Sequence, residues 1–178
     1  MENQKSIDKL FGNFFEKYSN GRIILALFVL NIIFPAVVFP LFQGDTANVP
    51  LDLQFSYSPE KAYQLLAQYS VQELKMYRIL ELTGDVIYPI VYGFFLSLLI
   101  FKLRINSLLV LIPLLAIVAD LFENTGIVIL ISSLPKQLNT VASITSIFSS
   151  LKWSLIVISI LLIVIFGVQR LFLNKKAN

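Results

Sequence analysis

Residues 106–133 read NSLLVLIPLLAIVADLFENTGIVILISS. A helix rises about 1.5 Å per residue, so this stretch is long enough to cross the roughly 30 Å hydrocarbon core of a bilayer. Asp120 and Glu123 are its only charged residues. The stretch therefore predicts a transmembrane helix that carries polar groups inside the membrane, where such groups are costly and usually face the interior of a helix bundle.

Three further stretches have similar length and apolar character, at 22–42, 82–101 and 140–169. Of the 178 residues, 57% are hydrophobic and 14% are charged, which is more apolar than a soluble domain requires. The sequence predicts an all-α membrane protein, with a four-transmembrane-helix bundle as a single transmembrane domain over 1–178. It contains no Cys and no His, which excludes disulfides, thiol nucleophiles, imidazole bases and the usual zinc ligands.

The basic residues predict the orientation of the helices, because Lys and Arg are enriched in cytoplasmic segments. Most of them lie in the N-terminal segment, the connection after 101 and the tail at 170–178: Lys5, Lys9, Lys17, Arg22, Lys102, Arg104, Arg170, Lys175 and Lys176. We therefore expect both termini in the cytoplasm. We expect no cleaved signal peptide, which suits a bacterial inner (cell) membrane. No basic patch indicates binding to nucleic acid.

The N-terminal segment at 1–21 contains a helical pattern. Apolar side chains recur at the spacing of one helical face in SIDKLFGNFFEKY at 6–18, before Asn20 and Gly21. The pattern predicts an amphipathic helix on the inner membrane surface. Alternatively, the same face packs on the cytoplasmic ends of the bundle.

The connection at 43–81 predicts a small external cap between the first two transmembrane helices. Alternating apolar residues at 51–57 indicate a short extended piece. Ser58 and Pro59 predict the start of a helix, and the stretch at 70–73 matches a capping box. We expect the helix that begins at Ser70 to continue unbroken into the second span.

Polar residues share one face on each of the second and third spans, and a lysine lies on the fourth. They are Glu81, Asp85, Tyr88 and Tyr92 on and just before the second span, Asp120, Glu123 and Asn124 on the third, and Lys152 beside Trp153 on the fourth. Asn31, in the middle of the first span, is typical of an interhelical hydrogen bond rather than of a ligand.

Helical rise predicts that these residues lie at one height in the bundle. If neighbouring spans form antiparallel hairpins, Asp85 lies level with Glu123, and Lys152 lies level with a position next to Asp120. Carboxylates that outnumber their lysine cannot all ionise cheaply in a low dielectric, so at least one should hold a proton. The layer would then exchange a proton or hold a cation. Alternatively, its pairs simply hold the helices together.

Two motifs stand out on the middle helices, Asp85-x-x-Tyr88-Pro89-x-x-Tyr92 and Asp120-x-x-Glu123-Asn124. They resemble the motifs D-x-x-[FY]-P-x-x-Y and D-x-x-E-N of an uncharacterised family of bacterial four-helix integral membrane proteins, and the resemblance implies no assigned activity. The layout is similar in architecture to EXPERA-type proteins, which include sterol isomerases and sigma-2-type receptors. The histidine that the isomerase branch uses is absent here.

Three functions are compatible with these residues. First, the acidic layer binds or moves a cation, a proton or a lipophilic amine, with Asp85 and Asp120 as charge partners, Glu123 as proton carrier and Lys152 as internal counter-ion. Tyr88, Tyr92 and Trp153 would then form aromatic walls. Second, the chain is an accessory or scaffold subunit with a purely structural charge cluster, in a homo-oligomer or beside a membrane partner protein.

Third, the chain is an intramembrane lipid-modifying enzyme, whose carboxylates act as acid and base or grip a magnesium-type cation. No nucleophile or phosphate-binding loop supports an enzyme, so the protein is more readily interpreted as a non-enzyme. The sequence assigns no catalytic residue, no metal site and no cofactor. The lipid bilayer is its expected partner.

Overall fold

The computed structural model describes residues 12–42, 49–104 and 108–175 of the chain. The regular structure in these ranges is helical throughout, which confirms the predicted all-α class. Among the residues described, four helices are long and apolar enough to cross a membrane: Gly21–Leu41, Gly84–Leu103, Leu108–Ser133 and Asn139–Phe172. Their bounds agree with the predicted spans to within a few residues.

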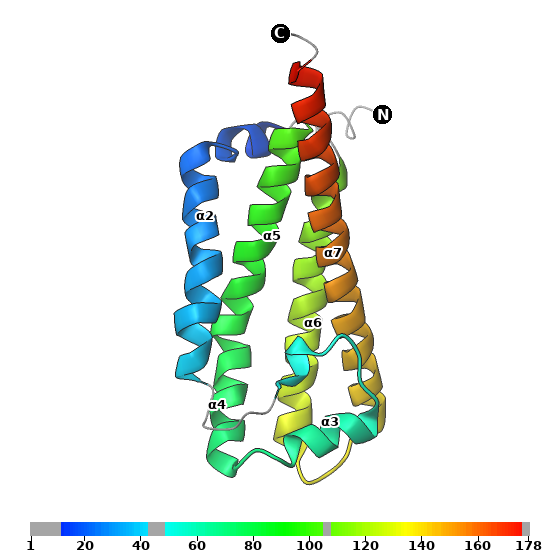
Figure 1. The fold of residues 1–178 in the computed structure, drawn as a ribbon. Coiled ribbons are helices and arrows are strands. Elements are labelled where there is room, and N and C mark those ends of the chain that lie inside the picture. Colours follow the sequence, from blue (N-terminus) through cyan, green and yellow to red (C-terminus); the bar gives the residue numbers. More distant parts are fainter. Residues whose placement is uncertain (1–11, 43–48, 105–107, 176–178) are drawn as a thin grey trace.

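The long helices run side by side along the molecule (Figure 1). They are α2 (Gly21–Ile33), α5 (Gly84–Leu103), α6 (Leu111–Ser133) and α7 (Asn139–Lys175). The short helix at 12–18 and the C-terminal part of α7 lie at one end of the bundle, and the connection between α2 and α5 lies at the other (Figure 1).

Close contacts between α5, α6 and α7 depend on glycines. A Cβ atom on Gly93 would overlap the side chain of Ile117, and one on Gly126 would overlap the side chain of Thr145. Small residues allow helices to approach closely where packing rather than water drives their association. These three helices therefore form the core of the bundle.

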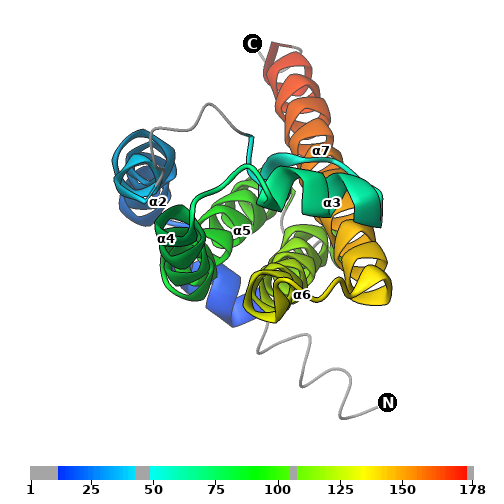
Figure 2. The same ribbon diagram turned by 90° about the horizontal axis from the view of Figure 1, so that it is seen from below.

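Helix α2 lies at the edge of the bundle, beside α5 (Figure 2). None of its residues is buried. After Ile33 the chain continues as a π-helical turn, Phe34–Val38, and a 3-10 turn, Phe39–Leu41. Pro35 and Pro40 lie in these turns and lack the backbone donor that a regular α-helix uses at each position. The C-terminal part of this span is therefore an irregular helix.

The helix at 12–18 packs on the end of the bundle. Phe15 is buried there, with its ring centroid 5.4 Å from that of Phe101, and Phe166 of α7 belongs to the same apolar cluster. The described part of the N-terminal segment thus supports the second interpretation, in which its apolar face packs on the end of the bundle. The rest of the predicted amphipathic helix, at 6–11, lies outside the described residues.

The connection between α2 and α5 covers the other end of the bundle (Figure 2). Its described part contains α3 (Pro59–Leu66) and α4 (Val71–Leu82). Ser58 caps α3 by accepting a hydrogen bond from a backbone amide, and the predicted capping box of Ser70 and Glu73 is present before α4. Both helix starts were therefore predicted correctly.

Serines on α7 bind the backbone of this connection. The Oγ atom of Ser150 donates to the carbonyl of Phe55 at 2.9 Å, and the amide of Tyr57 donates to Ser146 Oγ at 2.8 Å. Ser149 Oγ also donates to the carbonyl of the residue before Phe55. In an irregular segment, backbone groups lack the partners that a helix provides. The serine hydroxyls supply such partners here.

Two predictions for the connection need correction. The first part of the predicted extended piece, Leu51–Leu53, is a 3-10 turn with Leu51 buried in the apolar cluster against α6, and the chain becomes extended only at Gln54. The helix from Ser70 does not continue into the second span. It ends at Leu82, and Thr83 has φ −128° and ψ −81°, outside the helical region.

Candidate functional site

Lys152 on α7 forms ion pairs with two carboxylates of α6. Its Nζ atom lies 2.5 Å from Oε2 of Glu123 and 3.5 Å from Oδ1 of Asp120. All three side chains are buried. The spacing of three residues places both acids on the face of α6 that contacts α7. The predicted pairing of Lys152 with these acids is confirmed, and we call the three residues the Lys152 cluster.

Tyr92 and Asn124 connect the Lys152 cluster to α5. The Tyr92 hydroxyl donates to Oδ2 of Asp120 at 2.8 Å. The side-chain amide of Asn124 donates to the backbone carbonyl of Asp85 at 2.6 Å. Tyr92 satisfies the second oxygen of Asp120, whereas Oε1 of Glu123 is buried without a hydrogen-bond partner among the described residues. This side of the site therefore holds α5, α6 and α7 together.

Asp52, in the 3-10 turn of the connection, reaches the same layer. Its backbone carbonyl accepts hydrogen bonds from Lys152 Nζ at 3.0 Å and from Trp153 Nε1 at 3.3 Å. The Tyr77 hydroxyl donates to Oδ1 of Asp52 at 2.7 Å and accepts from the amide of Leu51. Burial, and then the charge of Asp52, raise the pKa of Tyr77 well above its ordinary value, so this hydroxyl keeps its proton and donates.

A second group of acids, which we call the acidic triad, consists of Asp52, Glu81 and Asp85. One carboxylate oxygen of each residue lies within 4.8 Å of those of the other two. Within the described ranges, no Lys or Arg forms an ion pair with any of them. The acidic triad therefore differs from the Lys152 cluster, whose charges have a partner.

Glu81 is the most deeply buried member of the acidic triad. Its exposed fraction is 1%, and neither of its carboxylate oxygens has a hydrogen-bond partner among the residues that the structure describes. Burial raises the pKa of Glu81 well above its ordinary value, and the charges of Asp52 and Asp85 raise it further. The charge of Lys152 opposes this rise but is the smallest of these effects, so an ionised Glu81 favours a further positive charge nearby.

The two groups together are strongly acidic. Five carboxylates against the one ammonium of Lys152 leave four negative charges if all the acids ionise. Tyr57, whose hydroxyl is buried, lies beside them, and burial and the charges of Glu123 and Asp52 raise its pKa. Like charges in a low dielectric disfavour one another's ionised forms. The layer thus favours the arrival of a cation or of protons.

Tyr88 lies at the edge of this layer, with its ring centroid 5.5 Å from that of Tyr92. The ring of Tyr88 packs against Phe34 and Phe39 beyond α2, with centroids 5.5 and 5.1 Å away. Asn31, predicted to bond between helices, instead donates to the carbonyl of Leu27 in its own helix at 2.9 Å. The first span therefore contributes aromatic packing rather than a polar group to this region.

Asp52 was not singled out as a site residue from the sequence. Asp52 lies in a connection whose path over the bundle depends on tertiary packing, so helical spacing gives no information about its height. The available signal was an acidic residue between Leu51 and Leu53, in an apolar run. Glu81, predicted on the polar face just before the second span, is a member of the acidic triad.

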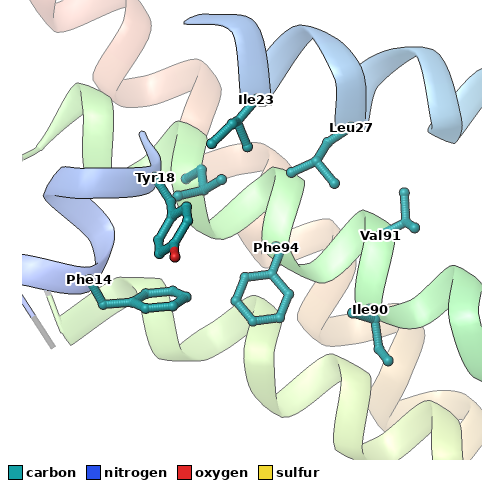
Figure 3. A pocket seen from close by; sticks show the side chains of 8 residues that line it. Phe14, Tyr18, Ile23, Leu27, Ile90, Val91 and Phe94 are labelled. Atoms are coloured by element: carbon teal, nitrogen blue, oxygen red, sulfur yellow. The ribbon is translucent and has the colours of Figure 1, made fainter. Parts of the chain in front are cut away.

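A separate apolar cavity of about 220 Å³ lies between the helix at 12–18, α2 and α5 (Figure 3). Phe14 and Tyr18 line it from the first of these elements, and Leu27 and Phe94 from the other two. It has no acidic side chain in its lining. The cavity is therefore distinct from the charged layer.

No model of a protein family matches the chain, and neither a curated protein nor a solved structure matches it. The functional argument therefore depends on the geometry and charge of the side chains.

Proposed function

We propose that the chain is an integral membrane protein whose four long helices span the bilayer. The apolar surfaces of the outer helices support this. Leu25 on α2 is 61% exposed and Val164 on α7 is 55% exposed. Many other large apolar side chains on the same two helices are also exposed. Such continuous apolar surfaces are unfavourable in water and suited to lipid.

The proposed orientation has both termini in the cytoplasm. Basic residues gather at the end of the bundle where α7 finishes: Arg170 donates to the carbonyl of Lys102 at 3.0 Å, and Arg104 lies over the ring of Phe166. The positive-inside rule then places the acidic layer towards the external face of the membrane. A bacterial inner membrane is the residence that we propose.

We propose further that the acidic triad binds a cationic ligand, either an inorganic cation or the ammonium group of a lipophilic amine. One observation carries this proposal: three carboxylates converge with no cationic side chain paired to them in the described part of the chain. Buried charges in proteins are normally paired or bound to metals. A cationic ligand would supply the missing charge.

A purely structural role is the second candidate, and the Lys152 cluster favours it. This cluster joins α6 to α7 and also binds the carbonyl of Asp52. A scaffold function explains Asp120 and Glu123 well. It does not explain Glu81, a buried carboxyl group that has neither an ion pair nor a hydrogen bond among the described residues, whereas Glu123 has its ion pair with Lys152. We therefore assign structure to the Lys152 cluster and binding to the acidic triad.

The proposal can be tested by the fluorescence of Trp153, because it is the only tryptophan and bonds to Asp52. The full chain would be placed in nanodiscs of zwitterionic phosphatidylcholine and titrated separately with Ca²⁺ and with dodecylamine. We expect a saturable change with at least one probe that Asp85→Asn abolishes. Glu60→Gln, an exposed carboxylate in α3, should leave the titration unchanged. No saturable change with either probe would contradict the proposal.

A further inference from the structure

We infer that Asp52, Glu81 and Asp85 bind one divalent metal ion of about the size of Ca²⁺. This inference rests on the proposed function and names the ligand of its site. The metal ion would be held by the turn Leu51–Leu53, the last turn of α4 and the first turn of α5.

The separation of the three oxygens suits a metal ion at their centre. Because no two of them are more than 4.8 Å apart, a central point lies within about 2.8 Å of all three. Ca²⁺ binds oxygen at about 2.3–2.6 Å, and Mg²⁺ at about 2.0–2.1 Å. The carboxylates need to move only by tenths of an ångström to bind Ca²⁺, and further to bind Mg²⁺.

Glu81 is independent evidence for a ligand at this point. A carboxyl group that is 1% exposed would normally accept hydrogen bonds, but neither oxygen of Glu81 does so from the residues described. One of these oxygens is the atom that lies near Asp52 and Asp85. A metal ion there would satisfy the group that the protein leaves without a partner.

The surroundings of Asp52 orient it as a metal ligand. Tyr77 holds one oxygen of its carboxylate, and Lys152 and Trp153 hold its backbone carbonyl. Metal ligands in proteins are commonly fixed by such outer hydrogen bonds. Asp52 is only half-buried, so the metal ion can reach the acidic triad from its side.

The donor set selects the class of metal. The three side chains offer only carboxylate oxygens, and the sequence contains no Cys or His, so hard cations are favoured over zinc or copper. A primary ammonium group could meet the same three oxygens but brings a single charge. A divalent ion neutralises two of the three carboxylates and is the better complement.

The test is calorimetric titration of the full chain in phosphatidylcholine nanodiscs, after treatment with a chelator, using Ca²⁺, Mg²⁺ and dodecylamine separately. We expect one Ca²⁺ per chain, bound more tightly than Mg²⁺, and a higher melting temperature in Ca²⁺ than in chelator. Glu81→Gln should weaken Ca²⁺ binding at least about tenfold. Its melting temperature in chelator should be no lower than that of the wild type, because it removes a buried acid.

Asp52→Asn provides a second variant at a half-buried position and should weaken Ca²⁺ binding in the same way, whereas Glu60→Gln should not. The inference is overturned if Ca²⁺ does not bind, or if it binds Glu81→Gln and Asp52→Asn as tightly as the wild type. Saturable binding of dodecylamine without Ca²⁺ binding would overturn the metal site and leave the proposed function standing. Binding of neither probe would overturn both.

Discussion

The Nζ atom of Lys152 lies 2.5 Å from Oε2 of Glu123, with both side chains buried between α7 and α6. The same ammonium group also reaches Asp120 and the carbonyl of Asp52. One lysine thus joins two long helices to the connection that covers their end. Among the described residues, it forms no ion pair with the carboxylates of the acidic triad beside it.

Replacing this lysine should destabilise the protein. Lys152→Met leaves Glu123 and Asp120 as buried acids without their partner, which should cost about 3–5 kcal/mol in the free energy of unfolding. Lys152→Met combined with Glu123→Gln should recover part of this loss. Lys136→Met, at an exposed position, should change stability by less than about 0.5 kcal/mol. Reversible unfolding in detergent would measure all three, and a negligible effect of Lys152→Met would refute the assigned role.

Glycine at the contact between α6 and α7 should be required for packing. Gly126→Ala places a methyl group against Thr145 and should cost about 1–3 kcal/mol. Gly167→Ala is the matched control, because nothing lies within 4 Å of the added Cβ atom. That control should be neutral or slightly stabilising. Equal melting temperatures for the two variants would show that the contact is not tight.

The serines of α7 should hold the connection in place. Ser146→Ala removes the acceptor of the Tyr57 amide, and the loss of one hydrogen bond costs about 1 kcal/mol. We expect faster hydrogen exchange at Tyr57 and its neighbours, measured by mass spectrometry. Ser154→Ala, whose hydroxyl bonds only within α7 among the described residues, should leave this exchange unchanged. Identical exchange in both variants would contradict the assignment.

Tyr77 should position Asp52 for cation binding. Tyr77→Phe removes the hydroxyl that binds Asp52 and should weaken Ca²⁺ binding about tenfold, the usual effect of losing an outer hydrogen bond to a metal ligand. Tyr69→Phe is the control, because the hydroxyl of Tyr69 has no hydrogen-bond partner in the ranges described. Calorimetric titration of both variants checks the prediction. An unchanged affinity for Tyr77→Phe would show that Asp52 needs no such support.

The long helices, and the side chains placed by helical spacing, could be predicted from the sequence. Length and apolar character located the four long helices, and helical rise placed Lys152 level with Asp120 and Glu123, which the ion pairs confirm. Cap residues located the starts of α3 and α4. Each of these depends on local spacing, which a single sequence contains.

The acidic triad could not be predicted in the same way. Asp52 reaches Glu81 because Leu51 packs against α6 and Tyr77 holds the turn. Neither contact can be deduced from the helical spacing of residues in the sequence. The break at Thr83 was overlooked because an apolar helix pattern continues across it, although Gly84 beside it is a typical signal of a helix end. Of the acidic triad, Glu81 and Asp85 were therefore predicted from helical spacing, and Asp52, whose place depends on tertiary contacts, was not.

The most direct test of the cation site is the position of a bound ion. Crystals of the full chain grown in a lipid phase would be soaked in Mn²⁺, which scatters X-rays anomalously and binds carboxylate oxygens as Ca²⁺ does. We predict an anomalous peak between Asp52, Glu81 and Asp85 that disappears in Glu81→Gln. Crystals that show no peak there at a Mn²⁺ concentration that saturates the protein in solution would contradict the account.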